Sequence, residues 1–186
     1  MRKKRGIMGK IKSSLPESMN FGNESAANSE QRAEKFNNYF TSVADLLANE
    51  IVPGENPFQA YLPDPVPFSF FLSPTSLNEI KDIMKKLKLS SAGHDDMDIR
   101  VIKECTDTIS PFLVHMINSS FQEGVFPKHL EIARIVLVYK KGDRFDHTNY
   151  RPISILSCFS KIFEKVVVAS LINYLTQHSL LAKEQF

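Results

Sequence analysis

The chain has 186 residues, of which 42% are hydrophobic and 24% charged, and its formal net charge is +2. This composition is that of a globular protein with one main core, and it excludes a wholly disordered chain. The two cysteines, Cys105 and Cys158, form no CxxC pair, which excludes a disulfide framework and a cysteine-based zinc site.

Residues 1–28 are predicted to be a disordered basic tail. Six Lys and Arg side chains fall in the first twelve residues, and no apolar period accompanies them. Two alternatives to a solvated tail stay open: a nuclear localisation signal and an arm that contacts phosphates. The basic start lacks the apolar core of a signal peptide, and no apolar run reaches the roughly 18 residues of a membrane span. We therefore expect an intracellular protein, in the nucleus or the cytoplasm, with no membrane partner.

Residues 29–50 are predicted to form an amphipathic helix, because aromatic and aliphatic side chains recur there at three- and four-residue spacing. Asn28 or Ser29 can cap this helix. Six of the ten prolines follow within residues 51–74, where missing amide donors and restricted φ angles forbid a helix or an interior strand. We interpret residues 51–74 as an extended linker.

A compact part is expected over residues 75–186. A capping box of Ser76 and Glu79 predicts the start of a first helix, and a short helix is expected near residues 98–105. Ser110-Pro111 predicts the start of a further helix, which Gly124 ends. Residues 133–139 have the β-branched density of a strand buried on both faces. Ile153 and Ile155 resume strand character, and Ser157 or Ser160 starts a long helix. The order of elements predicts a mixed α/β fold, mostly helical with a β-hairpin.

The segment HDDMD, residues 94–98, holds three carboxylates and raises the question of a metal site. Two-metal chemistry needs carboxylates on a rigid frame, and this segment also lacks the glycine and the distal glutamate of an EF-hand loop. We favour a helix-capping turn in which Asp95 or Asp96 satisfies free amides, and we predict no metal ligands and no catalytic residues in the chain.

The stretch between the two predicted strands is the strongest candidate for a binding site. Lys140 and Lys141 close the first strand and Arg151 opens the second, so a hairpin would bring three cations to one polyanion. Pro152 biases Arg151 to extended geometry. Residues 126–165 carry eight Lys and Arg side chains against four Asp and Glu. An ordinary solvated hairpin is the alternative.

These residues also resemble a known family. KKGDRFDHTNYRPISILSCFSKIFEKVV, residues 140–167, resembles the fingers segment of reverse transcriptases from non-long-terminal-repeat (non-LTR) retrotransposons, the jockey-like and other LINE-type elements. LKLSSAGHDDMDIRVIKE is similar to the family's Lys-Ser-x-Gly-x-Asp-Gly turn, and NSSFQEGVFPKHLEIARIVLVYKKGD to the passage after that turn. AEKFNNYFTSVADLL is similar to the helix between endonuclease and polymerase domains. The likeness covers roughly residues 33–186. The family usually has Gly where Asp96 stands and often Pro where His94 stands.

The resemblance implies the fingers and the start of the palm of a right-hand polymerase, as a partial reverse transcriptase domain over residues 75–186. It implies that Lys140, Lys141 and Arg151 contact the triphosphate of the incoming nucleotide. It also implies that Asn149 and Tyr150 brace the hairpin or contact the template. In the intact parent, the partners would be an RNA template and a DNA primer, and the cofactor would be Mg²⁺; protein partners stay unassigned.

Family members continue from Glu-Gln-Phe into Gly-Phe-Arg and only later reach the carboxylates that hold the catalytic metals, whereas this sequence stops at Phe186. We therefore expect a fragment without a cofactor, which does not polymerise DNA by itself. Two other functions stay open. One is a noncatalytic nucleic-acid-binding remnant that uses the basic tail and residues 126–165, and the other is a fragment whose unpaired core surface binds a protein.

Overall fold

The computed structural model describes residues 15–22, 24, 26, 28–52, 54, 57, 60 and 67–181. More than half of the predicted basic tail and much of the predicted proline-rich linker, including Pro53, Pro63 and Pro65, lie outside the described residues. By its contacts the chain forms two units, one of Met1–Leu62 and Val136–Ile153 and the other of Pro63–Ile135 and Ser154–Phe186. Each unit has a hydrophobic core of its own.

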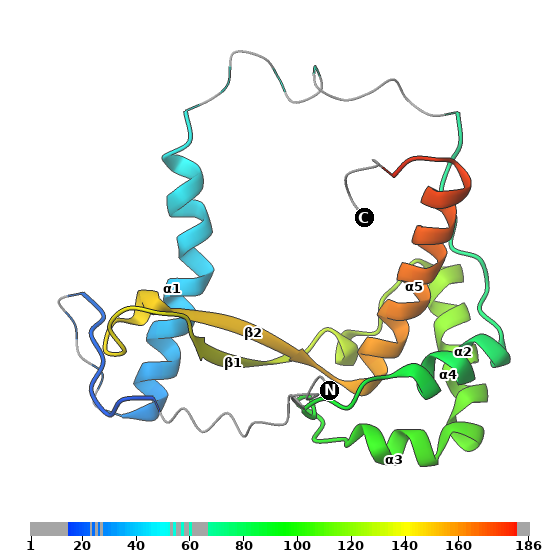
Figure 1. Ribbon diagram of the computed structural model, residues 1–186, viewed down its shortest axis with the longest axis horizontal. Coiled ribbons are helices and arrows are strands. Elements are labelled where there is room, and N and C mark those ends of the chain that lie inside the picture. Colours follow the sequence, from blue (N-terminus) through cyan, green and yellow to red (C-terminus); the bar gives the residue numbers. More distant parts are fainter. Residues whose placement is uncertain are drawn as a thin grey trace, which may run out of the picture. The chain divides into compact units, whose positions relative to one another are not determined.

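The first unit is built on the helix α1 (Ser29–Asn49), as predicted (Figure 1). Its N-cap is Asn28, whose side-chain oxygen accepts a hydrogen bond of 2.8 Å from the amide of Gln31. Phe36 of α1 forms a small buried cluster with Met19 and Tyr150. Farther along the helix Leu46 is 60% exposed, so within the described residues only the first half of α1 packs on this core.

The two strands, β1 (Ala133–Tyr139) and β2 (Tyr150–Leu156), pair in a two-stranded sheet. The amide of Lys140 donates to the carbonyl of Asn149 over 2.8 Å, which fixes the register and sets Tyr139 opposite Tyr150. The prediction that residues 133–139 are buried on both faces is wrong, since Ile135 is 53% exposed. In the described part of the chain β1 pairs with β2 alone, and only Leu137 and Tyr139 of β1 join the aromatic cluster.

The second unit is helical and consists of α2 (Leu77–Lys86), α3 (Ile99–Glu104), α4 (Thr106–Glu123) and α5 (Cys158–Gln177), with a 3₁₀ turn at Lys128–Leu130. The helix α2 packs against α4 and α5. The core side chains are fully or nearly fully buried and come from all four helices and from Leu87, the C-cap of α2: Ile80, Met84, Leu87, Ile99, Ile102, Leu113, Ile117, Cys158, Ile162, Phe163 and Val166. The predicted mixed α/β composition, mostly helical with a β-hairpin, is confirmed.

Side-chain caps start two of these helices where the sequence placed them. The Ser76 hydroxyl accepts from the Glu79 amide over 3.2 Å, and the Ser157 hydroxyl accepts from the Ser160 amide over 3.0 Å. The Glu79 carboxylate bonds the hydroxyl of Thr75, over 2.7 Å. This bond takes the place of the reciprocal half of the predicted capping box.

The predicted start of the next helix at Ser110-Pro111 is wrong. The helix α4 begins at Thr106 and runs through Pro111, which removes one backbone hydrogen bond from its second turn. Burial of Ser110, Leu113 and Ile117 in the core stabilises the helix across that gap. Its end is as predicted, because Gly124 takes the left-handed conformation with φ 68°. None of the helices in the described ranges is long and apolar enough to span a membrane.

Candidate functional site

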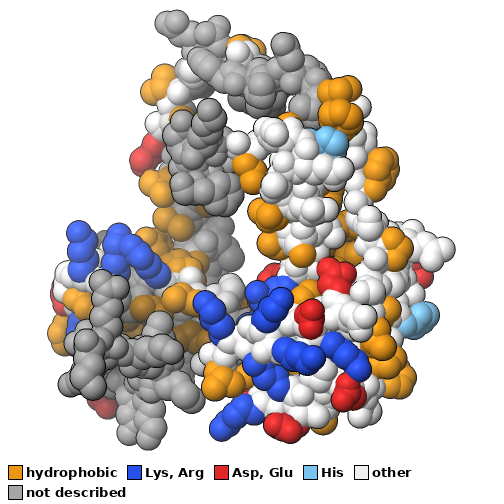
Figure 2. Space-filling model, turned by 45° about the vertical axis from the view of Figure 1, so that its right-hand side comes forward, with side chains coloured by type: hydrophobic (Ala, Val, Ile, Leu, Met, Phe, Trp, Pro, Cys, Tyr) orange, Lys and Arg blue, Asp and Glu red, His pale blue; other side chains and the backbone are white. Residues whose placement is uncertain are grey.

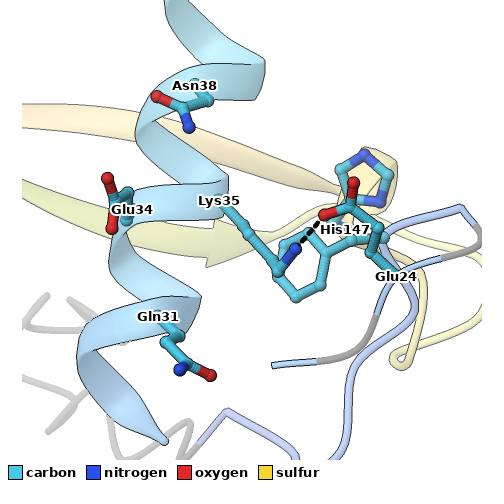
Figure 3. A pocket seen from close by; sticks show the side chains of 7 residues that line it. Glu24, Gln31, Glu34, Lys35, Asn38 and His147 are labelled. Carbon is cyan, nitrogen blue, oxygen red and sulfur yellow. Dashed lines mark hydrogen bonds and ion pairs between the residues drawn. The ribbon is translucent and has the colours of Figure 1, made fainter. Parts of the chain in front are cut away.

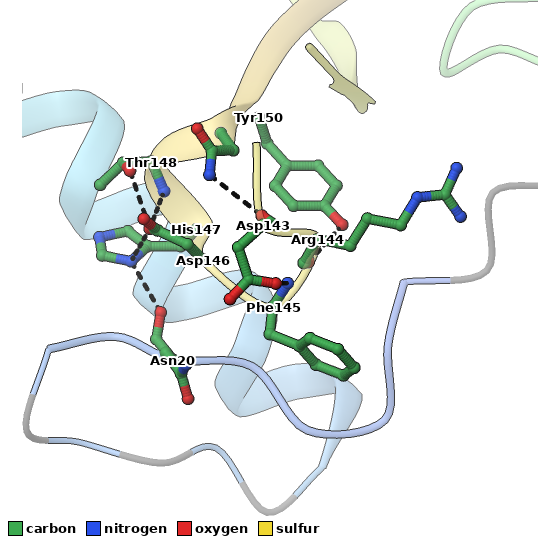
Figure 4. A network of polar contacts seen from close by, with 9 residues as sticks. Asn20, Asp143, Arg144, Phe145, Asp146, His147, Thr148 and Tyr150 are labelled. Carbon is green, nitrogen blue, oxygen red and sulfur yellow. Dashed lines mark hydrogen bonds and ion pairs between the residues drawn. The ribbon is translucent and has the colours of Figure 1, made fainter. Parts of the chain in front are cut away.

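The candidate site lies at the end of the hairpin, in the tip loop of residues 140–149 (Figure 4). The loop is closed by hydrogen bonds of its own residues. The Asn149 side-chain amide donates to the carbonyl of Asp143 over 3.0 Å, and the Asp143 carboxylate accepts from the amide of Phe145 over 2.9 Å. The loop is therefore an ordered turn, stabilised within itself, that joins the two strands.

Gly142 is required by this geometry. Its φ is 97°, in a region that side chains with a Cβ rarely adopt, and an added Cβ would lie 2.7 Å from the side-chain nitrogen of Asn149. The glycine of the KKGD segment thus lets Asn149 pack directly on the loop backbone.

Tyr150 joins the loop to the aromatic core. Its ring is 5% exposed, its hydroxyl donates to the carbonyl of Arg144 over 2.8 Å, and burial raises the pKa of Tyr150. The Arg144 guanidinium lies over the ring of Tyr139, 5.0 Å from its centroid. These contacts tie Arg144, in the middle of the loop, to both strands.

Asp146 caps the short 3₁₀ turn His147–Asn149 at the end of the loop. Its carboxylate accepts from the Thr148 amide over 2.9 Å and from the Thr148 hydroxyl over 2.8 Å. These hydrogen bonds lower the pKa of Asp146. The Asp146 carboxylate is thus hydrogen-bonded within the loop.

The three predicted phosphate-contacting cations, Lys140, Lys141 and Arg151, are exposed. Among the described residues none of their side chains forms an ion pair or a hydrogen bond. Since Lys140 lies opposite Asn149, it is a diagonal neighbour of Arg151 across the hairpin. Alternation along the strands sets both on the face opposite Tyr139 and Tyr150, at a typical diagonal spacing of roughly 7–8 Å. The strand pairing does not fix the position of the Lys141 side chain. Phosphate contact by Lys140, Lys141 and Arg151 stays a prediction.

A second motif that the sequence analysis singled out is the turn of residues 90–98, in the second unit. An added Cβ on Gly93 would lie 2.7 Å from the Cα of Ser157, so the turn contacts the start of α5 backbone to backbone. From α5, Lys161 donates to the Ser90 hydroxyl over 3.0 Å. The SSAG part of the motif is therefore explained by close packing on α5.

The acidic part of this turn accepts hydrogen bonds from backbone amides, as predicted for Asp95, although the helix cap itself is Asp98. Asp98 is the N-cap of α3 and accepts from the Arg100 amide over 2.8 Å. Asp95 accepts from the Met97 amide over 3.3 Å, and Asp96 pairs with Arg134 over 2.5 Å. Within the described ranges, no three His, Cys, Asp or Glu side chains are grouped so that they could hold a metal ion. Asp95, Asp96 and Asp98 are each engaged by a backbone amide or a guanidinium of this chain.

Asp96 occupies the position where the resembling family has glycine, and its backbone shows why. Its φ is 52°, in the left-handed region that glycine adopts most easily and that Asp tolerates better than most residues. Asp96 thus adopts a backbone conformation that a glycine at this position would favour.

Three basic side chains of the second unit, Lys81, Arg100 and Arg134, pair with acidic neighbours among the described residues, and Figure 2 shows basic and acidic side chains intermixed on its surface. Lys81 pairs with Asp107 over 2.6 Å, and Arg100 pairs with Asp98 over 2.5 Å. Lys81 and Arg100 would have to leave their carboxylate partners to bind an anion, whereas Lys140 and Arg151 would not.

A hollow in the first unit was not predicted from the sequence (Figure 3). Its lining side chains come from α1, the segment before it and the tip loop: Phe21, Glu24, Gln31, Glu34, Lys35, Asn38 and His147. The ammonium group of Lys35 pairs with the Glu24 carboxylate across it. The only sequence signal was the polar face of α1 with its spacing of three and four residues, which equally suits a solvated helix face.

Comparison with known proteins shows what the chain is related to. Over 130 residues, 69% of this chain, it is 34% identical to the RNA-directed DNA polymerase from mobile element jockey of Drosophila melanogaster. The chain is a relative of the non-LTR retrotransposon reverse transcriptases. A further relative, the probable RNA-directed DNA polymerase from transposon BS of the same species, is 28% identical over 175 residues, 89% of this chain. The jockey polymerase of Drosophila funebris is 34% identical over 116 residues, 61% of this chain.

The resemblance predicted from the sequence is thereby confirmed. The aligned parts are 14%, 18% and 12% of the lengths of these three reverse transcriptase relatives, so the chain spans less than a fifth of each. No family model matches the chain.

Proposed function

We propose that this chain supplies the nucleotide-triphosphate contacts of a reverse transcriptase, and that Lys140, Lys141 and Arg151 make them. The observation that carries the proposal is the pair of unengaged cations, Lys140 and Arg151, on one face of a hairpin whose tip is closed by its own hydrogen bonds. Relatives named as RNA-directed DNA polymerases support the choice of a nucleotide as the anion.

The chemistry of the two side chains suits a triphosphate. The planar guanidinium of Arg151 can bind two phosphate oxygens at once, and the ammonium of Lys140 adds a compact charge beside it. Because neither has an acidic partner among the described residues, a bound triphosphate would not have to displace an ion pair. The order of the loop lowers the entropy cost of holding both groups in place.

For Asn149 and Tyr150 the contacts favour bracing over template binding. The side-chain amide of Asn149 and the hydroxyl of Tyr150 are already used on carbonyls of the tip loop. We propose that these two residues hold the loop, and that RNA template and DNA primer are partners of the whole enzyme.

In the proposed reaction Mg²⁺ would stabilise the charge that develops on the transferred phosphate. Asp96 and Asp98 serve as an ion-pair partner and a helix cap, and the described residues offer no cluster of carboxylates for this ion. We therefore propose that this chain binds the nucleotide but that residues other than those described hold the metal, so no chemical step is assigned to Lys140 or Arg151.

The test is calorimetric titration of the full chain with a deoxynucleoside triphosphate at low salt. Lys140→Ala and Arg151→Ala should each weaken triphosphate binding by roughly tenfold or more, because a hydrogen bond to a charged group contributes about 1.5–3 kcal/mol. Lys165→Ala, which removes an exposed cation of α5, is the matched control and should leave the affinity unchanged. Equal affinities in all four proteins would refute the proposal.

The alternative function, general nucleic-acid binding, predicts a different result. A single-stranded RNA oligonucleotide would bind with an affinity that falls steeply with salt, and Lys165→Ala would weaken it as much as Lys140→Ala. The triphosphate would then show no preference for the residues of the hairpin.

A further inference from the structure

The tip loop is held from outside the hairpin by a segment that precedes α1. The backbone of Asn20 forms a parallel bridge with Asp146. Its amide donates to the carbonyl of Phe145 over 2.7 Å, and its carbonyl accepts from the amide of His147 over 3.4 Å. Residues far apart in the sequence are thus joined through main-chain atoms, in the region shown in Figure 4.

The imidazole of His147 strengthens this junction. Its Nδ1 lies 2.8 Å from the Asn20 carbonyl oxygen, and because a carbonyl can only accept, Nδ1 carries the proton and donates. The same carbonyl therefore receives both the amide and the ring of His147. The side chain is 17% exposed, so most of it is removed from water.

Aromatic rings keep the imidazole in this orientation. Tyr39 of α1 meets it edge-on with centroids 4.6 Å apart, and Phe21 lies against it at 5.1 Å. Phe21 in turn packs edge-on against Phe36, 5.2 Å away, in the buried cluster that also holds Tyr150. The outer edge of the loop is thereby fixed to α1 and to the core of the first unit.

We propose that Asn20 and His147 form a latch that positions the tip loop for triphosphate binding, so that residues before α1 belong to the site without touching the ligand. The inference rests on the proposed function of Lys140 and Arg151. The hydrogen bonds within the loop close it on itself, whereas among the described residues the hydrogen bonds of Asn20 and the ring contact of Phe21 with His147 tie residues 145–147 to the segment before α1. Breaking the latch does not alter Lys140 or Arg151 themselves. It lowers the fraction of molecules in which both side chains face the anion together.

Two pairs of variants test the side-chain and main-chain halves of the latch. His147→Ala removes the ring and its hydrogen bond, whereas His147→Asn offers an amide donor near the position of Nδ1. Asn20→Pro removes the amide that donates to Phe145, whereas Asn20→Ala keeps it, since the side chain of Asn20 is exposed and the bridge uses only main-chain atoms. His129→Ala, at an exposed histidine of the 3₁₀ turn Lys128–Leu130, is the control.

The measurements are calorimetric affinity for inorganic triphosphate and amide hydrogen exchange of residues 143–149. We expect His147→Ala and Asn20→Pro to weaken triphosphate binding by roughly tenfold, because the fraction of molecules able to bind falls by the same factor. Both changes should also speed amide exchange in the loop. His147→Asn should recover part of the affinity, and Asn20→Ala and His129→Ala should match the unmodified chain. Exchange in α4 and α5 should stay slow in every variant, which shows that the second unit remains folded.

The outcomes separate the latch from the site it serves. If the unmodified chain binds triphosphate and His147→Ala and Asn20→Pro bind it equally well, the latch is refuted and the proposed function stands. The latch is also refuted if loop exchange speeds up while affinity is unchanged. If the unmodified chain does not bind triphosphate at all, the proposed function fails, and the positioning role fails with it.

Discussion

Gly93 and Ser157 lie so close that no side chain fits between their backbones. A Cβ on Gly93 would come within 2.7 Å of both the Cα and the nitrogen of Ser157. Ser157 is the N-cap of α5, so the turn of residues 90–98 is seated on the start of this helix. The glycine of the family's turn motif is therefore explained by packing.

Gly93→Ala should destabilise the protein by about 1–3 kcal/mol, because the clash is with backbone that cannot rotate away. Gly124→Ala is the matched comparison, since an added Cβ there meets nothing within 4 Å and the cost is only that of φ 68°. That cost is about 1 kcal/mol. Urea unfolding followed by circular dichroism measures both. An equal or smaller loss for Gly93→Ala would contradict the close approach.

Asp96 should tolerate glycine better than alanine. Asp96→Gly relieves the left-handed backbone at φ 52° and loses the exposed ion pair with Arg134, so its stability should stay within about 1 kcal/mol of the original. Asp96→Ala loses the same ion pair and keeps the strain, and it should be about 1 kcal/mol less stable than Asp96→Gly. Thermal unfolding of the two variants decides this, and a more stable alanine variant would argue against the left-handed turn.

Asp98 should stay ionised in strongly acidic solution. Its hydrogen bonds with the side chain and the amide of Arg100 lower its pKa from 3.8 to about 2. The carboxylate's contribution to stability is therefore complete above about pH 4 and is lost as the pH falls through about 2.

The change can be followed by NMR titration of the Asp98 carboxyl carbon. Asp98→Asn keeps a capping oxygen without the charge, so the stability difference between this variant and the original chain should shrink below pH 4. A titration midpoint at 3.8 or above would show that the contact with Arg100 does not form in solution.

Tyr150→Phe should loosen the tip loop without unfolding the first unit. The change removes the hydrogen bond to the Arg144 carbonyl and keeps the buried ring, at a cost of about 1 kcal/mol. Amide exchange in residues 143–149 should become faster. Tyr174→Phe removes a comparable bond, to the Phe68 carbonyl over 3.0 Å, and should leave loop exchange unaltered. Unchanged exchange in both variants would remove Tyr150 from the bracing role.

Local signals in the sequence predicted most helix boundaries of the structure. Asn28, Ser76 and Ser157 cap the helices that they were expected to cap, because a capping bond involves residues only two or three positions apart. The same local rule failed at Pro111, where burial of Ser110 and Leu113 keeps the helix continuous through a residue that normally begins one. Tertiary packing outweighed the local signal.

At the candidate site the sequence predicted the hairpin but gave no sign of the contact with residues before α1. The bond between Asn20 and the tip loop uses main-chain atoms, so it requires no particular side chain at Asn20. His147 looked like one of five unrelated histidines, because its partners Phe21 and Tyr39 are more than a hundred residues away in the chain. Long-range contacts of this kind leave no periodic pattern to read.

The central claim, that Lys140 and Arg151 hold one anion together, is tested most directly by a double-mutant cycle on triphosphate binding. Calorimetric affinities are needed for the unmodified chain, Lys140→Ala, Arg151→Ala and the double variant. Two side chains that share a ligand should show a coupling energy of roughly 0.5–3 kcal/mol, whereas Lys140 and Lys165 should be additive within about 0.5 kcal/mol. Strict additivity of Lys140→Ala and Arg151→Ala, or full affinity in the double variant, would contradict the account.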